Sequence, residues 1–177
     1  MVHMNNLLKI ILLCTLPIHV SALEANIAYV FGVSIGKPLS KDYIPNTANS
    51  YPTRLITLPV PQSYELDVFE SINVQIIEKS KRVYSISAEI EMTEGGECND
   101  LFKRMLSQLD KKYKHLKKTS EINVGDKVIP IFDGYLSSGK KIKMDVYCSR
   151  KESSPIETFG ISVSDRELSE EANKLWQ

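Results

Sequence analysis

Strict alternation of apolar and polar residues in "RVYSISAEIEM", Arg82–Met92, constrains this fold more than any other feature of the sequence. A period of two predicts a β-strand with one buried face and one solvated face. We therefore expect Glu89 and Glu91 on the wet face, and on the buried face the five apolar side chains Tyr84, Ile86, Ala88, Ile90 and Met92.

The same period recurs on both sides of this strand. The stretch "INVQIIE", 72–78, alternates likewise, and "EKSKR", 78–82, has the composition of a hairpin connection, so the two strands should be antiparallel neighbours. A shorter strand is expected near "KVIPIF", 127–132, then a turn near "SSGK", 137–140, and a further strand at "ETFGISVS", 157–164. Between the turn and that last strand, "KKIKMDVYC" places four residues on one face: Ile142, Met144, Val146 and Cys148.

Two segments have helical spacing instead. Glu97 and Asp100 precede a lysine-rich end, as the helix dipole favours. From this acidic start to the lysine-rich end, apolar residues recur at spacings of three, four and seven, which predicts a long helix over about 98–118. These apolar residues are Cys98, Phe102, Met105, Leu109 and Leu116. The stretch "SDRELSEEANKLWQ" predicts a short helix over about 165–176, with capping-box spacing between Ser164 and Glu167. The expected fold class is α+β, a mainly antiparallel sheet packed by these helices.

The amino-terminal segment has the three-part layout of a secretory signal peptide. Lys9 precedes the apolar run "IILLCTLPIHV", and "VSA" supplies small residues for cleavage after Ala22. The run is shorter than the roughly 20 residues that a helix needs to cross a bilayer. We predict a signal peptide over 1–22, one α+β domain over 23–177 with no transmembrane span, and a periplasmic or secreted location. Lipidation at Cys14, a retained anchor and a buried helix are the alternatives.

Two cysteines stay in the predicted mature chain, Cys98 and Cys148. An even pair in an oxidising compartment is typical of a disulfide. Each also falls on an apolar face, Cys98 at the head of the helical stripe and Cys148 at the end of a strand. We expect a Cys98–Cys148 disulfide that fastens the long helix to the sheet, and two unpaired core thiols are the alternative.

The stretch "YVFGVSIGKPLS", Tyr29–Ser40, is similar to a phosphate-binding loop but departs from it at two points. The spacer between Gly32 and Gly36 is one residue short, and Pro38 replaces the required Ser or Thr and lacks an N–H. We interpret it as a first strand, in which Phe31 and Val33 alternate with their neighbours, followed by a turn after Gly36.

No other motif predicts a cofactor, a metal or a catalytic residue. His115 is the one histidine of the predicted mature chain, which argues against a histidine-based metal site or catalytic triad. Glu89 and Glu91 should lie about 7 Å apart on one strand face. That separation is compatible with the carboxylate pair of an inverting glycosidase, so a small carboxylate-dependent hydrolase is one alternative function.

Charge suggests one candidate surface. The chain has 22 basic and 22 acidic residues, which predicts no general affinity for nucleic acid or membranes. A basic patch could nevertheless meet an acidic partner protein, anionic lipid or an envelope polymer, although a solvated helix end explains its lysines more simply: Lys111, Lys112, Lys114, Lys117, Lys118, Lys140, Lys141 and Lys143.

Several segments together resemble small exported proteins of bacteria that have no assigned activity. They are the signal peptide, the "FGVSIG" and "VYSISAEI" strands, a cysteine leading a helix that ends "LDKKYK", and a strand ending "YC". The resemblance implies a periplasmic location and an α+β fold, and no catalytic residue. Export without catalytic motifs predicts a non-enzymatic binding protein of the bacterial envelope. Its most concrete version is an inhibitor or immunity protein that occludes a toxin or hydrolase.

Overall fold

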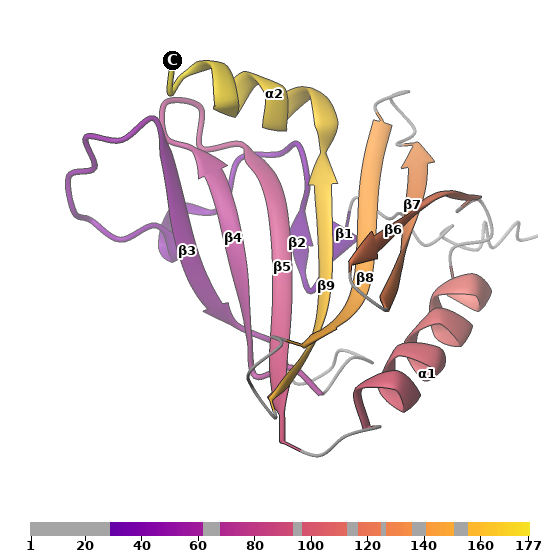
Figure 1. Ribbon diagram of the computed structural model, residues 1–177. Helices are drawn as coiled ribbons and strands as arrows, with labels where there is room; N and C mark the ends of the chain where they lie inside the picture. Colours follow the sequence, from indigo (N-terminus) through magenta and orange to yellow (C-terminus); the bar gives the residue numbers. More distant parts are fainter. Residues whose placement is uncertain are drawn as a thin grey trace, which may run out of the picture.

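In the part of the chain that the structure describes, seven antiparallel strands form one sheet, against which two helices and a small hairpin pack (Figure 1). The computed structural model describes residues 29–61, 68–93, 97–112, 117–124, 127–135, 141–150 and 156–177. The predicted signal peptide, the turn near 137–140 and His115 lie outside these ranges. The architecture confirms the expected α+β class.

Two meanders meet at the centre of the sheet, whose strand order is β3-β4-β5-β9-β8-β7-β6. The chain runs from β3 to β5, passes through helix α1 (Glu97–Lys112), restarts at the far edge with β6 and returns until β9 pairs with β5. β9 therefore joins the two halves. The strands are β3 (Thr53–Pro59), β4 (Ser71–Ile77), β5 (Val83–Met92), β6 (Lys117–Val124), β7 (Lys127–Tyr135), β8 (Lys141–Arg150) and β9 (Glu157–Asp165).

One face of the sheet carries the hydrophobic core. Helix α1 packs its apolar stripe over β8 and β9, and the Cys98–Cys148 disulfide, with a Cα–Cα distance of 5.9 Å, ties its first turn to β8. The predicted disulfide is thereby confirmed. Central strands supply the buried side chains on this face: Ile72, Val74, Ile86, Ala88, Ile142, Met144, Val146, Phe159, Ile161 and Val163.

A hairpin of β1 (Tyr29–Val30) and β2 (Val33–Ser34) adds to the same core, behind the sheet in Figure 1. The expected single strand through this segment is wrong, because the chain already reverses at Phe31 and Gly32, whose φ angles are 51° and 80°. A two-residue hairpin turn requires such angles, and glycine adopts them without strain. Phe31 tolerates its angle because its ring is buried edge-on against Phe69, at 5.8 Å between centroids.

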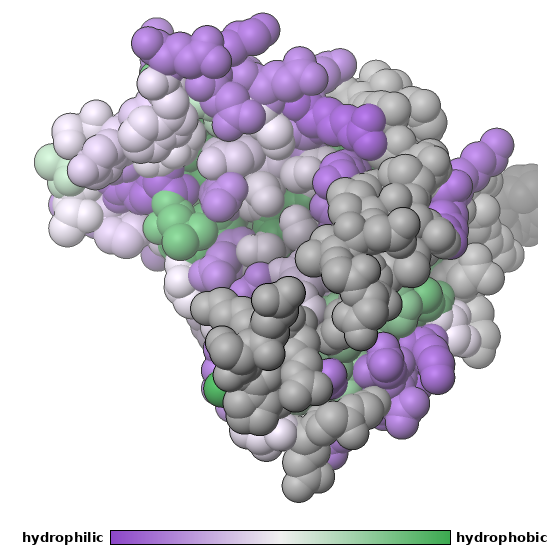
Figure 2. Space-filling view, in the orientation of Figure 1, coloured by the Kyte–Doolittle hydropathy of each residue, from purple (hydrophilic) through white to green (hydrophobic). Residues whose placement is uncertain are grey.

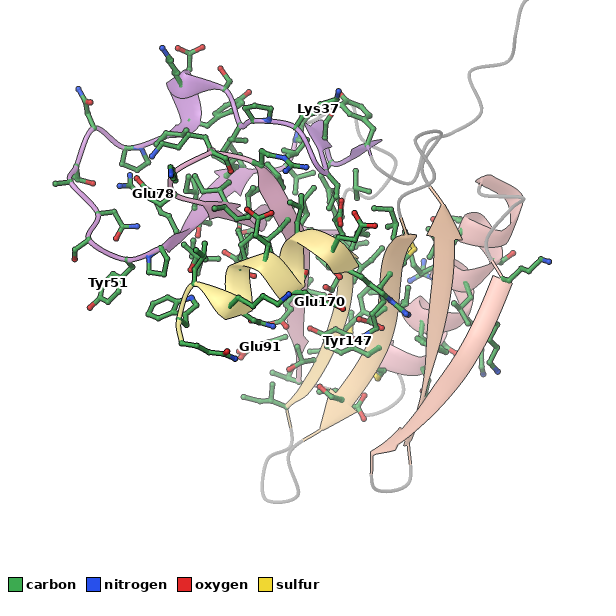
Figure 3. The ribbon with its side chains drawn as sticks, turned by 90° about the horizontal axis from the view of Figure 1, so that it is seen from above. Lys37, Tyr51, Glu78, Glu91, Tyr147 and Glu170 are labelled. Atoms are coloured by element: carbon green, nitrogen blue, oxygen red, sulfur yellow. A yellow bond between two sulfur atoms is a disulfide. The ribbon has the colours of Figure 1, made fainter. Side chains whose placement is uncertain are left out.

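The other face of the sheet is polar and is covered at one end by helix α2 (Arg166–Lys174). Leu168 and Ala172 of α2 pack on Ile77 and Tyr84. Beyond the helix, Trp176 stacks on Tyr51 at 5.6 Å, and Figure 3 shows Tyr51 at that end of α2. In Figure 2, hydrophilic side chains gather over α2 and a small hydrophobic area lies over β3.

Two expectations about strand β5 and helix α2 need correction. Tyr84 does not share the core face with Ile86, because a register shift opposite Gln75 and Ile76 turns its side chain toward α2. The N-cap of α2 is Asp165 rather than Ser164, which remains in β9. The carboxylate of Asp165 accepts from the Leu168 N–H at 3.1 Å, and aspartate is as good an N-cap as serine.

The long helix ends earlier than expected, at Lys112 instead of near 118, and the chain is extended again from Lys117. Leu116 continued the apolar spacing of α1 and so favoured a longer helix. Closely spaced lysines oppose one another within a helix, and β-branched residues in "KKTSEINV" favour a strand. The prediction therefore missed β6, the far edge of the sheet.

Candidate functional site

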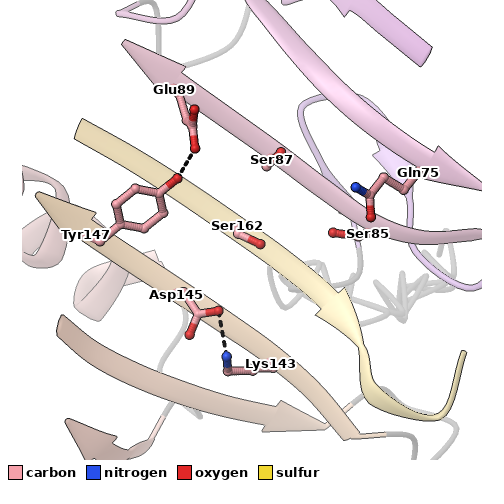
Figure 4. Close-up of a pocket in the computed structure, with 8 residues that line it drawn as sticks. All are labelled: Gln75, Ser85, Ser87, Glu89, Lys143, Asp145, Tyr147 and Ser162. Carbon is pink, nitrogen blue, oxygen red and sulfur yellow. Dashed lines mark hydrogen bonds and ion pairs between the residues drawn. The ribbon is translucent and has the colours of Figure 1, made fainter. Parts of the chain in front are cut away.

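A pocket of about 420 Å³ opens on the polar face of the sheet. We call it the polar pocket. Neighbouring strands β4, β5, β9 and β8 supply its walls because their register aligns polar residues in rows: Lys143 pairs with Ser164 and Ser164 with Ser85, while Asp145 pairs with Ser162 and Ser162 with Ser87. Its lining consists of Gln75, Ser85, Ser87, Glu89, Lys143, Asp145, Tyr147 and Ser162 (Figure 4).

Tyr147 forms one wall by reaching across β9. The backbone register places Tyr147, Gly160 and Glu89 in one cross-strand row. A Cβ atom at position 160 would come within 2.6 Å of three side-chain atoms of Tyr147, so only glycine leaves room for the phenol. The ring crosses β9 and its hydroxyl donates a hydrogen bond to Glu89 Oε1 (Figure 4).

The phenol of Tyr147 is held as a hydrogen-bond donor. Burial raises its pKa, and the hydrogen bond to Glu89 together with the negative charges of Glu89 and Asp145 raises it further. Tyr147 therefore stays protonated at neutral pH and keeps the Glu89 carboxylate fixed at the rim of the polar pocket.

Asp145 supplies the other carboxylate of the pocket. Its Oδ2 forms an ion pair with Lys143 Nζ at 2.9 Å, and its side chain is 20% exposed. Its Oδ1 is buried and accepts no hydrogen bond from any described residue. An acceptor in this position would be stabilised by a ligand that donates a hydrogen bond, since an unsatisfied buried acceptor costs about 1–3 kcal/mol.

Of the two glutamates that the hydrolase hypothesis requires, one lines the polar pocket. Glu89 lines the polar pocket, whereas Glu91 is exposed and is not among the residues of its wall. A glycosidase pair must face one substrate from two sides. The second carboxylate of the polar pocket is instead Asp145, from β8.

Two of the lysines predicted to form a basic patch are brought into one row. Lys117 pairs with Asp133 across β6 and β7, and Asp133 pairs with Lys143 across β7 and β8. Lys117 and Lys118 are exposed, and Lys143 is engaged by Asp145. The other members lie wholly or with their side chains outside the described part of the chain, so the patch stays a prediction: Lys111, Lys112, Lys114, Lys140 and Lys141.

Among the described residues, Cys98, Cys148 and Glu157 form the group whose ligand-type atoms lie close enough together to hold a metal, all within 4.8 Å. Both sulfur atoms are used by the disulfide, so this group is not a thiolate site in the oxidised protein. The "YVFGVSIGKPLS" segment is likewise engaged in the fold. Its Gly36 N–H donates to Val83 O at 2.8 Å, and the Leu39 N–H to Lys81 O at 2.9 Å.

Sequence reasoning missed most of the polar pocket. The signal was present, because Lys143, Asp145 and Tyr147 alternate with the apolar residues of "KKIKMDVYC". Periodicity assigned them to a wet face but could not show that β9 brings that face beside the serines of β5. Of its lining residues, Glu89 was named from the sequence for a carboxylate pair and Lys143 for the basic patch.

Comparison with protein-family models, curated proteins and solved structures finds no match to this chain. Among the described residues, neither helix has the length and apolar character needed to cross a membrane. The polar pocket is therefore the feature of this protein that bears on its function.

Proposed function

We propose that this protein is an exported, non-enzymatic binding protein of the bacterial envelope and that its ligand occupies the polar pocket. The observation that carries the proposal is Asp145, which lines an open pocket and whose buried Oδ1 has no hydrogen-bond donor among the described residues. Ligand sites typically combine a concavity with a few fixed polar groups. Here the Lys143 ion pair and the Tyr147 hydrogen bond fix both carboxylates.

Export is supported by two independent features. The segment before Leu23 has the layout of a signal peptide, and the Cys98–Cys148 disulfide is of a kind that persists in oxidising compartments. Expression of the full chain in a bacterium, followed by fractionation and intact mass measurement, should recover a periplasmic form that begins at Leu23. A cytoplasmic full-length form would contradict export.

Binding is tested by filling the polar pocket. Ser87→Trp places an indole in the pocket, whereas Thr57→Trp places it on the exposed face of β3, in the same row of the sheet but outside the pocket. Purified wild-type protein should bind a component of envelope extract, detected by chemical-shift changes or by retention on immobilised protein. Ser87→Trp should abolish this and Thr57→Trp should not. Equal binding by both variants would overturn the assignment of the site.

The narrower inhibitor or immunity hypothesis predicts that the bound component is a protein, which mass spectrometry of the retained fraction would identify. The hydrolase alternative gains no support from the geometry, because Glu91 lies outside the polar pocket. Attachment through the lysine patch predicts instead that Lys117→Glu and Lys118→Glu release the protein from envelope fractions.

A further inference from the structure

We infer that the ligand of the polar pocket is a carbohydrate, whose ring would lie against Tyr147 and whose hydroxyl groups would bond to the pocket walls. The inference rests on the proposed function, since it names the ligand class for the same site. It depends on three observations about the pocket: the kinds of polar group in its walls, the placement of the Tyr147 ring, and the unused acceptor capacity of its carboxylates.

The walls offer donors and acceptors together. Ser85, Ser87 and Ser162 contribute hydroxyl groups, each of which can both donate and accept, and the Gln75 amide can do the same. The hydroxyl groups of a sugar also donate and accept, so they can satisfy both functions. A ligand that carries only donors or only acceptors would leave part of this hydrogen-bonding capacity unused.

The Tyr147 ring offers a flat surface at the edge of these groups. It lies across β9 over Gly160, with its hydroxyl tied to Glu89, and Figure 4 shows its face turned outward from the sheet. The face of an aromatic ring is electron-rich and attracts the positive edge of C–H groups. A pyranose ring presents such C–H groups on one face and hydroxyl groups around its rim. Its C–H face could therefore stack on the Tyr147 ring while its hydroxyl groups bond to the polar side chains beside that ring.

The carboxylates require hydrogen-bond donors. Asp145 Oδ1 has none among the described residues, and the hydrogen bond from Tyr147 engages only one oxygen of Glu89. A phosphate or nucleotide would meet two carboxylates and a single ammonium group that is already paired with Asp145, so its charge is disfavoured. An apolar ligand would leave the polar groups of the pocket walls without hydrogen-bond partners.

A polyamine is the strongest competing ligand, because its ammonium groups would also satisfy the two carboxylates. It would offer donors alone, however, and would meet the Lys143 ammonium group with like charge. A neutral sugar satisfies Asp145 and Glu89 without that repulsion. The lining therefore favours carbohydrate over a cation.

Isothermal titration with soluble oligosaccharides tests the inference. The probes are the tetrasaccharides of N-acetylglucosamine, of β-1,4-glucose and of α-1,4-glucose, with spermidine as the competing cation. At least one tetrasaccharide should bind, with weaker binding or none for spermidine. Tyr147→Ala should weaken sugar binding by tenfold or more through loss of the ring surface, and Asp145→Asn by about fivefold through loss of an acceptor.

Two variants separate these effects from misfolding. Tyr147→Phe keeps the ring and loses only the hydrogen bond to Glu89, so it should retain binding within about threefold of the wild type. Glu91→Gln changes an exposed neighbour outside the pocket and should leave binding unchanged. Circular dichroism and thermal melting of each variant confirm that it is folded.

The outcomes distinguish failure of the inference from failure of the proposed function. Binding of spermidine, but of no sugar, that Ser87→Trp abolishes would overturn the carbohydrate inference and leave the binding site intact. A protein partner captured through the polar pocket, with no sugar bound, would do the same. Sugar binding that is equal in the wild type, Tyr147→Ala and Ser87→Trp would overturn the inference. If Ser87→Trp also leaves every binding partner of the envelope extract unaffected, the proposed function fails as well.

Discussion

Glu78 holds the long loop that precedes β3 against the edge of the sheet. Its Oε2 pairs with Arg54 Nε at 3.0 Å, and Lys81 pairs with its Oε1. Arg54 in turn donates to the carbonyl groups of Pro45 at 2.9 Å and Thr47 at 2.8 Å. Both side chains are largely buried, 10% exposed for Arg54 and 18% for Glu78. One carboxylate thus organises a segment that has little regular structure of its own.

This network makes stability depend on pH. Burial alone would raise the pKa of Glu78, but hydrogen bonds from Lys81 and Asn49 and the charges of Lys81 and Arg54 outweigh it and lower the pKa below 4.5. The folded state therefore binds this proton more weakly than the unfolded chain does. The stabilisation is complete above the unfolded value and is lost as the pH falls through the folded value.

Glu78→Gln should lower the free energy of unfolding at pH 7 by about 1–3 kcal/mol, because it removes the charge and leaves Arg54 poorly matched. Urea denaturation at pH 7 and at pH 3 should find a smaller difference from the wild type at the lower pH. Glu170→Gln, on the exposed side of α2, is the control and should cost little at either pH. A difference that is the same at both pH values would contradict this account.

Gly160 is required by a neighbouring side chain and not by its own backbone. Gly160→Ala should lower the free energy of unfolding by about 1–3 kcal/mol, because its Cβ would overlap the Tyr147 side chain. In the Tyr147→Ala background the same change should cost less than half as much. Thermal melting of the four proteins of this double-mutant cycle measures the difference. Equal costs in both backgrounds would mean that the phenol does not decide the residue at position 160.

At the level of elements, helix α1 is held to the sheet by a covalent bond as well as by its apolar stripe. The disulfide closes a loop between residues 50 positions apart in the sequence. Cys98 and Cys148 are both buried and belong to the same core as Leu101 and Met105 of the helix. The connection from β5 to β6 is thereby fixed at the start of α1.

Replacing both cysteines by alanine should lower the free energy of unfolding by about 2–4 kcal/mol, since the unfolded chain gains the conformational freedom that the cross-link removes. Urea denaturation of the oxidised wild type and the double variant measures the loss. Wild-type protein treated with a thiol reductant is the control and should match the variant. If the oxidised wild type is no more stable than the double variant or the reduced wild type, the disulfide contributes nothing to the stability of the folded state.

Periodicity predicted most individual elements and little of how they join. Strands β4, β5, β8 and β9, helix α2 and the start of helix α1 lie where alternation and helical spacing placed them, because each buries one face. Strand β6 was not predicted, because Leu116 continued the helical spacing and no glycine or proline separates it from "TSEINV". The hairpin of β1 and β2 was hidden because a turn with Phe31 in a left-handed conformation has no common sequence signature.

For the whole molecule, the decisive contact is the pairing of β9 with both β5 and β8. Without β9 the sheet would separate into two three-stranded meanders, β3-β4-β5 and β6-β7-β8. Phe159, Ile161 and Val163 of this strand are fully buried at the centre of the core. The polar pocket also exists only in the complete sheet, because β9 carries Gly160 and Ser162 between its two charged walls.

A chain that ends after Ile156 should therefore fail to fold, whereas one that ends after Lys174 should fold, since it keeps β9 and α2 and loses only exposed residues. Circular dichroism and the dispersion of amide proton resonances compare the two. Cooperative unfolding of the chain that ends after Ile156 would show that the strands before β9, together with α1, form a stable unit without it.

The late position of β9 in the sequence also bears on how such a chain could be delivered. A polypeptide that is threaded through a narrow membrane channel must stay unfolded until it has passed. Here the strand that completes the sheet is made after the other strands of the described residues. If the chain is exported as proposed, the sheet cannot close inside the producing compartment before β9 has been made, and the segments already threaded through would await their central partner on the far side.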